Sequence, residues 1–418
     1  MIKTTYNTTK FACYAANFTI SSAFCVPSIL FVTFRELYGI SYTLLGTLVL
    51  VNFCTQLAVD LIFTLFSKYF NIKLAVRAMP IITSIGFIVY SVAPTLFPNH
   101  IYAGLLVGTV IFSVSAGLAE VLVSPVIAAL PSDNPGRDMS TLHSLYAFGV
   151  FTMVIVSTLF LKIFGHDNWN YLIMILAILP LISAVIFMIS PMPNMTVQES
   201  DTKHKKRSKK HTVGLALSVA CIFCGSCAEN VMASWLSSYM EKSLCFDKSV
   251  GDIFGVAMFA ILLGLGRILY AAFGRNISKV IFFGMIGSAI CYITIGLSSN
   301  VIVSFIACIL TGLCTAMLWP GNLIMMEDST PNAGITAFAL MAAGGDIGAS
   351  LAPQLMGVII DKVAGSELAL SIGSTLNLTS EQVGMRAGML VTSVFPILGA
   401  ACVCAIVIYH KKVSSALK

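Results

Sequence analysis

Apolar stretches long enough to cross a membrane follow one another along almost the entire chain. A transmembrane helix needs about 20 predominantly apolar residues. We read twelve such spans, approximately at residues 11–34, 43–68, 74–96, 101–130, 138–162, 169–190, 213–240, 250–273, 278–298, 300–326, 334–360 and 383–409. These spans are too long and too uniformly apolar for the alternating strands of a membrane barrel. The sequence therefore predicts an all-α membrane protein with twelve transmembrane helices.

The low share of charged residues excludes an ordinary soluble enzyme. Charged residues make up 10% of the 418 residues and hydrophobic residues 57%, whereas soluble domains contain about 25% charged residues. The twelve cysteines lie almost entirely within the apolar spans, where a thiol packs as a small hydrophobic side chain. We therefore expect no enzymatic activity, no cofactor and no bound metal.

A pattern of apolar and small residues occurs twice, in the fourth and the tenth span. The first copy is Gly117-Leu-Ala-Glu-Val-Leu-Val-Ser-Pro125, and the second is Gly312-Leu-Cys-Thr-Ala-Met-Leu-Trp-Pro320. Duplicated apolar helices are typical of transporters built from repeats, whose substrate site lies where the repeats meet. We therefore predict two pseudo-symmetric six-helix bundles, residues 1–190 and 213–418, joined by a basic cytoplasmic linker at residues 191–212.

Basic residues gather on one side of the predicted topology. Most of them lie in segments that are internal when the N-terminus is inside, including the run from Lys203 to Lys210. The positive-inside rule then places both termini in the cytoplasm, with the chain in a plasma (bacterial inner) membrane. We therefore interpret the excess of basic residues behind the formal net charge of +6 as a topology signal. We expect the lipid bilayer, and not nucleic acid, to be the partner of the basic segments.

Short motifs occur in five of the predicted spans. They are Gly117-x-x-Glu120 in span 4, the stretch from Leu142 to Gly149 in span 5, Glu229 followed by Trp235 in span 7, Gly264-x-Gly266-Arg267 in span 8, and Trp319-Pro320-Gly-Asn322 in span 10. With the twelve spans and the basic linker, they resemble the major facilitator superfamily, and within it the fucose/galactose–proton symporter group. The resemblance implies that spans 1, 4, 7 and 10 line a central cavity, flanked by spans 2, 5, 8 and 11.

Four carboxylates are candidates for mid-membrane depth within the predicted spans: Asp60, Glu120, Glu229 and Asp346. A charged side chain at the bilayer centre costs ~2.5–3.5 kcal/mol on insertion scales, and therefore marks a candidate functional site. Glu120 matches a glutamate that the symporter group uses in proton handling, so it is our first candidate for proton coupling. The resemblance also places span 2 beside span 11. Asp60 and Asp346 then either share a proton or form separate hydrogen bonds.

The remaining candidates for transport are polar, aromatic and basic side chains. A sugar ring can stack on an aromatic face, and an amide offers both a donor and an acceptor. We predict substrate-binding roles for Asn17, Glu229, Asn230, Trp319 and Asn322. The resemblance places span 5 beside span 8, so we interpret His143 and Arg267 as gating residues. Packing between helices is the alternative for each of these side chains.

The predicted function is secondary active transport by a monomer. We expect proton-coupled uptake of a small polar, sugar-like solute by alternating access. The symporter group also has an aspartate in span 1, where this chain has only Asn17 and hydroxyl side chains. Proton-coupled efflux of drugs or metabolites is an alternative. An anion exchanger would need positive charge in both span 2 and span 8. Here span 8 has Arg267, but the corresponding position of span 2 is Asp60. A non-transporting receptor or scaffold would not need carboxylates within the spans.

Overall fold

Every regular element in the computed structural model is a helix, within residues 5–66, 69–133, 135–193, 209–274, 276–329 and 335–415, which the structure describes. Two compact units can be distinguished. Unit 1 comprises Met1–Ile40 and Val51–Gln198, and unit 2 comprises Ser41–Leu50 and Glu199–Lys418. The predicted all-α fold is confirmed.

The helices of the described residues match the predicted membrane spans. Ten of them are long and apolar enough to cross a membrane. The helix pair α1 (Tyr6–Ile29) and α2 (Phe31–Tyr38) passes the same criterion as one span bent by 44°. A shorter apolar helix, Phe148–Phe164, forms the second half of α6 (Pro135–Phe164). Each of the twelve predicted spans therefore contains a helix, and the chain is a multi-pass membrane protein.

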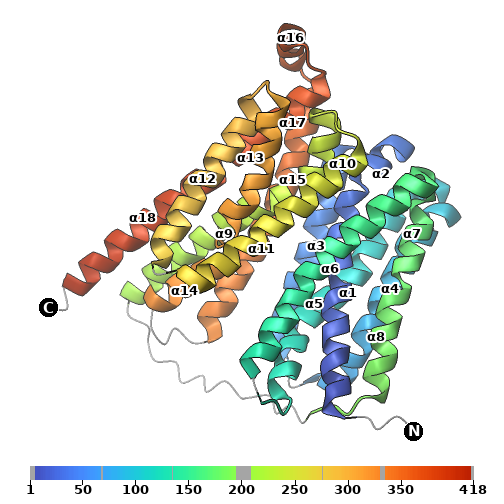
Figure 1. Ribbon diagram of the computed structural model, residues 1–418, viewed down its shortest axis with the longest axis vertical. Helices are drawn as coiled ribbons and strands as arrows, with labels where there is room; N and C mark the ends of the chain where they lie inside the picture. Colours follow the sequence, from blue (N-terminus) through green and yellow to red (C-terminus); the bar gives the residue numbers. More distant parts are fainter. Residues whose placement is uncertain are drawn as a thin grey trace. The chain divides into compact units, whose positions relative to one another are not determined.

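Unit 1 is built around α4 (Ile72–Leu96) and α5 (Ile101–Ala129), which pack against each other along their length. Both helices are labelled in Figure 1. Glycines allow this approach, because a Cβ atom at Gly108 would lie 2.6 Å from the Cα of Tyr90. The remaining helices of the unit are α7 (Trp169–Leu176) and α8 (Ile178–Ile189), with short 3-10 turns η2 (Pro98–His100) and η3 (His166–Asn168) before α5 and α7. Helix α8 packs against both α1 and α4.

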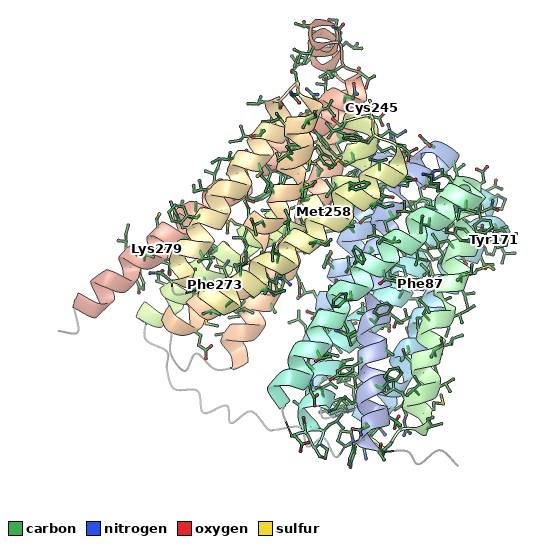
Figure 2. The ribbon with its side chains drawn as sticks, viewed as in Figure 1. Phe87, Tyr171, Cys245, Met258, Phe273 and Lys279 are labelled. Carbon is green, nitrogen blue, oxygen red and sulfur yellow. The ribbon has the colours of Figure 1, made fainter. Side chains whose placement is uncertain are left out.

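Aromatic side chains fill one end of unit 1. The rings of Phe34 and Trp169 meet edge to face at a centroid distance of 4.9 Å, a geometry that the aromatic quadrupole favours. The indole Nε1 of Trp169 donates a hydrogen bond of 3.0 Å to the hydroxyl of Tyr38, so its polar atom is satisfied. Phe87, labelled in Figure 2, is fully buried in the same unit, whereas Tyr171 is exposed.

Unit 2 is organised around α9 (Lys209–Ser238), which packs against α15 (Ile335–Ala364) and α18 (Val394–Ser415). Small residues on α15 bring the helices close together. A Cβ atom at Gly348 would lie 2.5 Å from the carbonyl oxygen of Phe223 on α9, and one at Gly344 would lie 2.7 Å from Val219. Such spacing of small residues permits close contact between membrane helices.

The other helices of unit 2 surround this core. Helix α13 (Val301–Thr315) packs against α11 (Met258–Phe273) and α12 (Ile277–Leu297), and α17 (Ser380–Thr392) packs against α15. The short helix α16 (Glu367–Leu376) lies at one end of the unit (Figure 1), in a segment that we did not predict as helical. Its N-cap Ser366 accepts a hydrogen bond from Ala369 N, a cap that the sequence pattern could have revealed.

Two irregular segments in unit 2 depart from the predicted straight spans. Predicted span 10 is interrupted, since a turn of four residues separates the end of α13 at Thr315 from the start of α14 (Pro320–Ser329). Between α9 and α11 the chain forms two π-helical turns, η4 (Tyr239–Ser243) and η5 (Gly251–Ala257), separated by α10 (Lys248–Val250). Breaks and π-helical turns are frequent at functional sites.

Helix α3 (Tyr42–Phe66) contributes to both units, because its first residues group with unit 2. The Asp361 carboxylate of α15 accepts hydrogen bonds from the backbone N–H groups of Tyr42 at 3.2 Å and Thr43 at 2.6 Å. The Tyr42 hydroxyl donates a 2.6 Å hydrogen bond to Glu381 of α17. An acidic side chain from a distant part of the chain therefore caps the N-terminus of α3, where its charge also complements the helix dipole.

The outside of both units is rich in exposed large apolar side chains. Examples are Ile163, exposed to 71%, and Phe273, exposed to 78% and labelled in Figure 2. Contiguous exposed apolar surface is uncommon in soluble monomers. Lipid tails are as apolar as these side chains, so such a surface is stable in a bilayer.

The contact between α15 and α9 predicts a contrast between two glycines. Gly348→Ala should lower the free energy of unfolding by about 1–3 kcal/mol, because the new methyl group would press against the backbone of Phe223. Gly264→Ala is the matched control, since a Cβ at Gly264 has no atom within 4 Å. It should leave stability unchanged or raise it slightly. Thermal unfolding of the purified variants in detergent measures both. Equal stabilities would contradict the close contact.

The cap on α3 predicts a graded loss of stability at Asp361. Asp361→Ala removes both acceptors and should cost about 1–2 kcal/mol, and Asp361→Asn, which keeps one oxygen, should cost less. Asp167→Ala, at an exposed aspartate of η3, serves as the control. Thermal unfolding again provides the measurement. The cap would be refuted by an Asp361→Ala variant as stable as the control.

Candidate functional site

A polar stripe runs along α3 within unit 1. Asn52, Gln56 and Asp60 are spaced four residues apart and therefore share one face of the helix. Asn52 Oδ1 accepts hydrogen bonds from Gln56 Nε2 at 2.8 Å and from Ser113 Oγ of α5 at 2.7 Å. A Cβ atom at Gly117 of α5 would lie 3.0 Å from the carbonyl oxygen of Gln56. The repeated motif around Gly117 thus lies against this stripe.

A pair of carboxylates lies at the end of the stripe. The Asp60 carboxylate interacts electrostatically with that of Glu120, three residues after Gly117 on α5. Asp60 is half-buried and its Oδ1 is buried without a hydrogen-bond partner among the described residues, whereas Glu120 is exposed. Two neighbouring carboxylates titrate as a coupled pair. The arrangement brings together two residues that we considered separately.

From the sequence we expected a different partner for Asp60. Our hypothesis of a proton shared with Asp346 joins residues of units 1 and 2 and stays a prediction. Asp346 itself is buried, with 7% of its surface exposed, on the helix that packs against α9. The i, i+4 spacing of Asn52, Gln56 and Asp60 could have revealed that the polar face of α3 continues to Asp60, but it gives no sign of Glu120 on another helix.

Two further predicted residues of unit 1 lie between α1 and α6. Asn17 Nδ2 donates a 2.7 Å hydrogen bond to the carbonyl oxygen of Leu142, so this amide already joins two helices. A Cβ atom at Gly149 of α6 would lie 2.4 Å from Phe18 O of α1, so these two helices are in close contact. His143 lies in α6, but its side chain is outside the described residues.

In unit 2, Arg267 connects three segments. Its Nε donates a 3.1 Å hydrogen bond to the carbonyl oxygen of Ala316, in the turn between α13 and α14. Its Nη2 lies 3.4 Å from Glu229 Oε1 on α9. A cation is favourable at the C-terminal end of a helix, where carbonyl groups lack partners. The pairing of Arg267 with Glu229 was not predicted. Pro320, at the first position of α14, could have signalled the break, because proline is common there.

The other predicted substrate residues of unit 2 are engaged within the protein. Asn230 Nδ2 donates to Ser226 O at 3.0 Å, and Asn322 Nδ2 donates to Leu318 O at 2.5 Å. Asn322 Oδ1 is buried without a hydrogen-bond partner among the described residues. The ring of Trp319 lies against Gly345, where a Cβ atom would be 2.3 Å away. Trp319 therefore contacts α15, and its role in substrate binding stays a prediction.

A buried charge cluster near the π-helical turns was missed by the sequence analysis. Asp252 is fully buried, and its Oδ2 lies 3.8 Å from Lys248 Nζ, which also lies 3.5 Å from Glu241 Oε2. Ser237 donates a hydrogen bond to Asp252. We had placed Lys248 in an external loop, although its i, i+4 spacing from Asp252 is typical of a helical ion pair.

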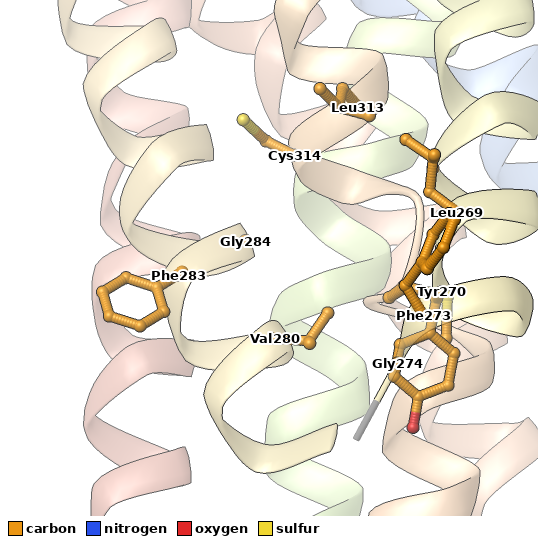
Figure 3. A pocket seen from close by; sticks show the side chains of 11 residues that line it. Leu269, Tyr270, Phe273, Gly274, Val280, Phe283, Gly284, Leu313 and Cys314 are labelled. Atoms are coloured by element: carbon orange, nitrogen blue, oxygen red, sulfur yellow. The ribbon is translucent and has the colours of Figure 1, made fainter. Parts of the chain in front are cut away.

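An apolar groove of about 410 Å³ lies between α11, α12 and α13 (Figure 3). Leu269, Tyr270, Phe273 and Leu313 form much of its lining, with Gly266 and Gly284. This lining offers few hydrogen-bonding groups, so the groove does not suit a hydroxylated solute. Among the described residues, no three His, Cys, Asp or Glu side chains are grouped so that they could hold a metal ion.

Solved structures of transporters share this fold. A D-xylose–proton symporter is 16% identical, with a TM-score of 0.75 over 94% of this chain and 97% of that one. A bacterial homologue of the human lysosomal transporter Spinster is 16% identical, with a TM-score of 0.73 over 97% of both chains. A nucleoside transporter is 12% identical, with a TM-score of 0.71 over 95% of this chain and 99% of that one. At these identities the similarity shows the fold.

Sequence comparison gives the family directly. A search of curated protein sequences found no match. The family model of the Major Facilitator Superfamily, however, matches residues 11–353. This match covers most of the chain, and the solved structures agree with it. The chain belongs to the major facilitator superfamily of membrane transporters.

Proposed function

We propose that the chain is a proton-coupled transporter that takes up a small polar, sugar-like solute by alternating access. The observation that carries the proposal is the carboxylate pair of Asp60 and Glu120. A membrane protein keeps ionisable groups within its spans at a cost of ~2.5–3.5 kcal/mol each, which points to a function. A coupled pair can bind and release a proton as its surroundings change.

The two predicted bundles, residues 1–190 and 213–418 with the linker 191–212, would be the halves that move in this cycle. Alternating access in repeat-built transporters is largely a rigid-body rocking of one bundle against the other. Rigid bundles need closely packed helices, and the glycine contacts within units 1 and 2 supply that packing. The protonation state of Glu120 would determine which conformations the loaded carrier reaches.

The choice of solute rests on chemistry and on resemblance. One fold relative is a D-xylose–proton symporter and another is a nucleoside transporter, so sugar-containing solutes are handled on this scaffold. The motif around Gly117 and Glu120 resembles the fucose/galactose–proton symporters. Glu229, Asn230, Trp319 and Asn322 would bind the solute, while Asp346 would contribute to proton handling and His143 and Arg267 to gating.

The membrane context completes the proposal. The basic residues on the predicted internal side place both termini in the cytoplasm of a bacterial cell, with the transporter in the inner membrane. The transporter would act as a monomer, because the family site lies within one chain.

Substitution of the carboxylates tests proton coupling. A thermal-shift screen of the purified protein against sugars, polyols, amino acids, organic acids and cationic drugs first identifies a solute. In proteoliposomes with an inward proton gradient, Glu120→Gln should abolish accumulation of that solute but leave exchange of preloaded solute measurable. Asp60→Asn should reduce accumulation as well, because the pair then no longer shares a proton.

The control for this experiment is Glu367→Gln, which neutralises an exposed carboxylate on α16. It should accumulate solute as the unmodified protein does. Accumulation by the Glu120→Gln variant at the control level would exclude Glu120 as the coupling group. The efflux alternative would be supported if lipophilic cations were the substrates and the protein reduced their uptake instead of raising it.

A further inference from the structure

The guanidinium of Arg267 is only partly used by the protein. It makes one hydrogen bond to the Ala316 carbonyl oxygen and one contact of 3.4 Å to Glu229. Arginine–carboxylate pairs are frequently bidentate, with N–O distances near ~2.8 Å. Here a single long contact joins the two groups. Arg267 Nη1 donates no hydrogen bond to any described residue, and the side chain is 45% exposed. The Nη1 edge of the guanidinium therefore has unused hydrogen-bond donors among the described residues.

The carboxylate of Glu229 is also incompletely satisfied. Its Oε2 is buried and has no hydrogen-bond partner among the described residues. A buried charge is stable when it is paired and hydrogen-bonded. A purely structural ion pair would be more stable if a second Arg267 nitrogen also donated a hydrogen bond to Glu229 Oε2. The single long contact instead leaves both Arg267 and Glu229 able to form hydrogen bonds with another group.

The elements that pack against α9 carry other charged residues, among them Asp346 (α15), Asp252 (η5), Arg386 (α17), Glu241 and Lys242 (η4) and Glu327 (α14). Among the described residues, the only electrostatic interaction of Glu229 is with Arg267. Any anion that engages Arg267 would therefore compete with Glu229 alone.

We propose that Arg267 binds a carboxylate of the transported solute and that Glu229 is the internal anion which this carboxylate replaces. The inference rests on the proposed function and narrows its sugar-like solute to a sugar acid. Arginine suits this role, because its fixed fork of donors matches a carboxylate. In this proposal Arg267 contacts the solute directly, in place of the gating role that we predicted for it.

Charge balance specifies how the exchange proceeds. The carboxylate of the solute forms hydrogen bonds with Arg267, and the contact between Nη2 and Glu229 Oε1 breaks. Glu229 then takes one proton from the aqueous phase and becomes neutral, because a buried carboxylate without a cation is unfavourable. Arg267 stays protonated, with Nε on Ala316. One solute anion and one proton thus bind together, and the charge of the site does not change.

Matched pairs of probes test this proposal. D-glucuronate and D-galacturonate differ from D-glucose and D-galactose by a carboxylate at the terminal carbon. Both uronates should raise the thermal stability of the purified full-length protein, and the neutral hexoses should do so much less. Arg267→Gln should weaken uronate binding by about tenfold or more, since it removes the charge-assisted hydrogen bonds. Lys279→Gln, at an exposed lysine of α12 labelled in Figure 2, should bind uronates as the unmodified protein does.

The pH dependence separates binding from a structural role of the pair. Because uronate binding requires a proton on Glu229, the apparent Kd should rise with increasing pH, by at most about tenfold per pH unit. Glu229→Gln already carries a neutral side chain, so its apparent Kd should be lower and independent of pH. This variant keeps the Arg267 hydrogen bond to Ala316. It therefore remains informative even where Arg267→Gln fails to fold.

The proposal is overturned if neither uronate stabilises the protein more than its neutral hexose, if Arg267→Gln binds uronates normally, or if Glu229→Gln keeps the pH dependence. These outcomes differ from a failure of the proposed function. Proton-driven uptake of a neutral hexose that depends on Glu120, with inert uronates, would overturn the sugar-acid assignment alone. Uronate binding with the expected pH dependence, but without proton-driven uptake, would overturn the proton-coupled uptake alone.

Discussion

Hydrocarbon offers no hydrogen bonds, so polar groups in the spans of this protein need partners inside the protein. Most of the described side chains meet this requirement through nearby carbonyl groups. Ser113 bonds to Asn52 and to Thr109 O, Asn17 to Leu142 O, and Trp235 to Pro353 O. Helix termini are satisfied in the same way, as the contact between Asp361 and the start of α3 shows. The functional arguments begin where this rule is broken.

Three oxygens in candidate residues break the rule: Asp60 Oδ1, Glu229 Oε2 and Asn322 Oδ1 are buried without hydrogen-bond partners among the described residues. A buried polar atom without a partner costs about 1–3 kcal/mol. The cost is reasonable where a proton or a solute supplies the missing partner during transport. Each of the two units thus contains its own unsatisfied carboxylate, Asp60 in unit 1 and Glu229 in unit 2.

The two carboxylates have different neighbours, and this difference assigns different chemistry to them. Asp60 has the like charge of Glu120 beside it, which favours one shared proton. Glu229 has the opposite charge of Arg267, which favours an ion pair that a competing anion can open. The turn after α13 leaves the Ala316 carbonyl oxygen free to accept the hydrogen bond that fixes Arg267.

The sequence alone determined the class of this protein. The length of the apolar spans requires helices in a membrane, and the repeated motif at Gly117 and Gly312 indicated two related halves. The close contact of α15 with α9 at Gly344 and Gly348 also depends on small residues that are visible in the local sequence. Only the tertiary structure decided which carboxylate meets which partner. Side chains on different spans are brought together by helix rotation and depth, and neither is encoded in local spacing. The proximity of Asp60 to Glu120 and of Arg267 to Glu229 therefore became visible only in the folded chain.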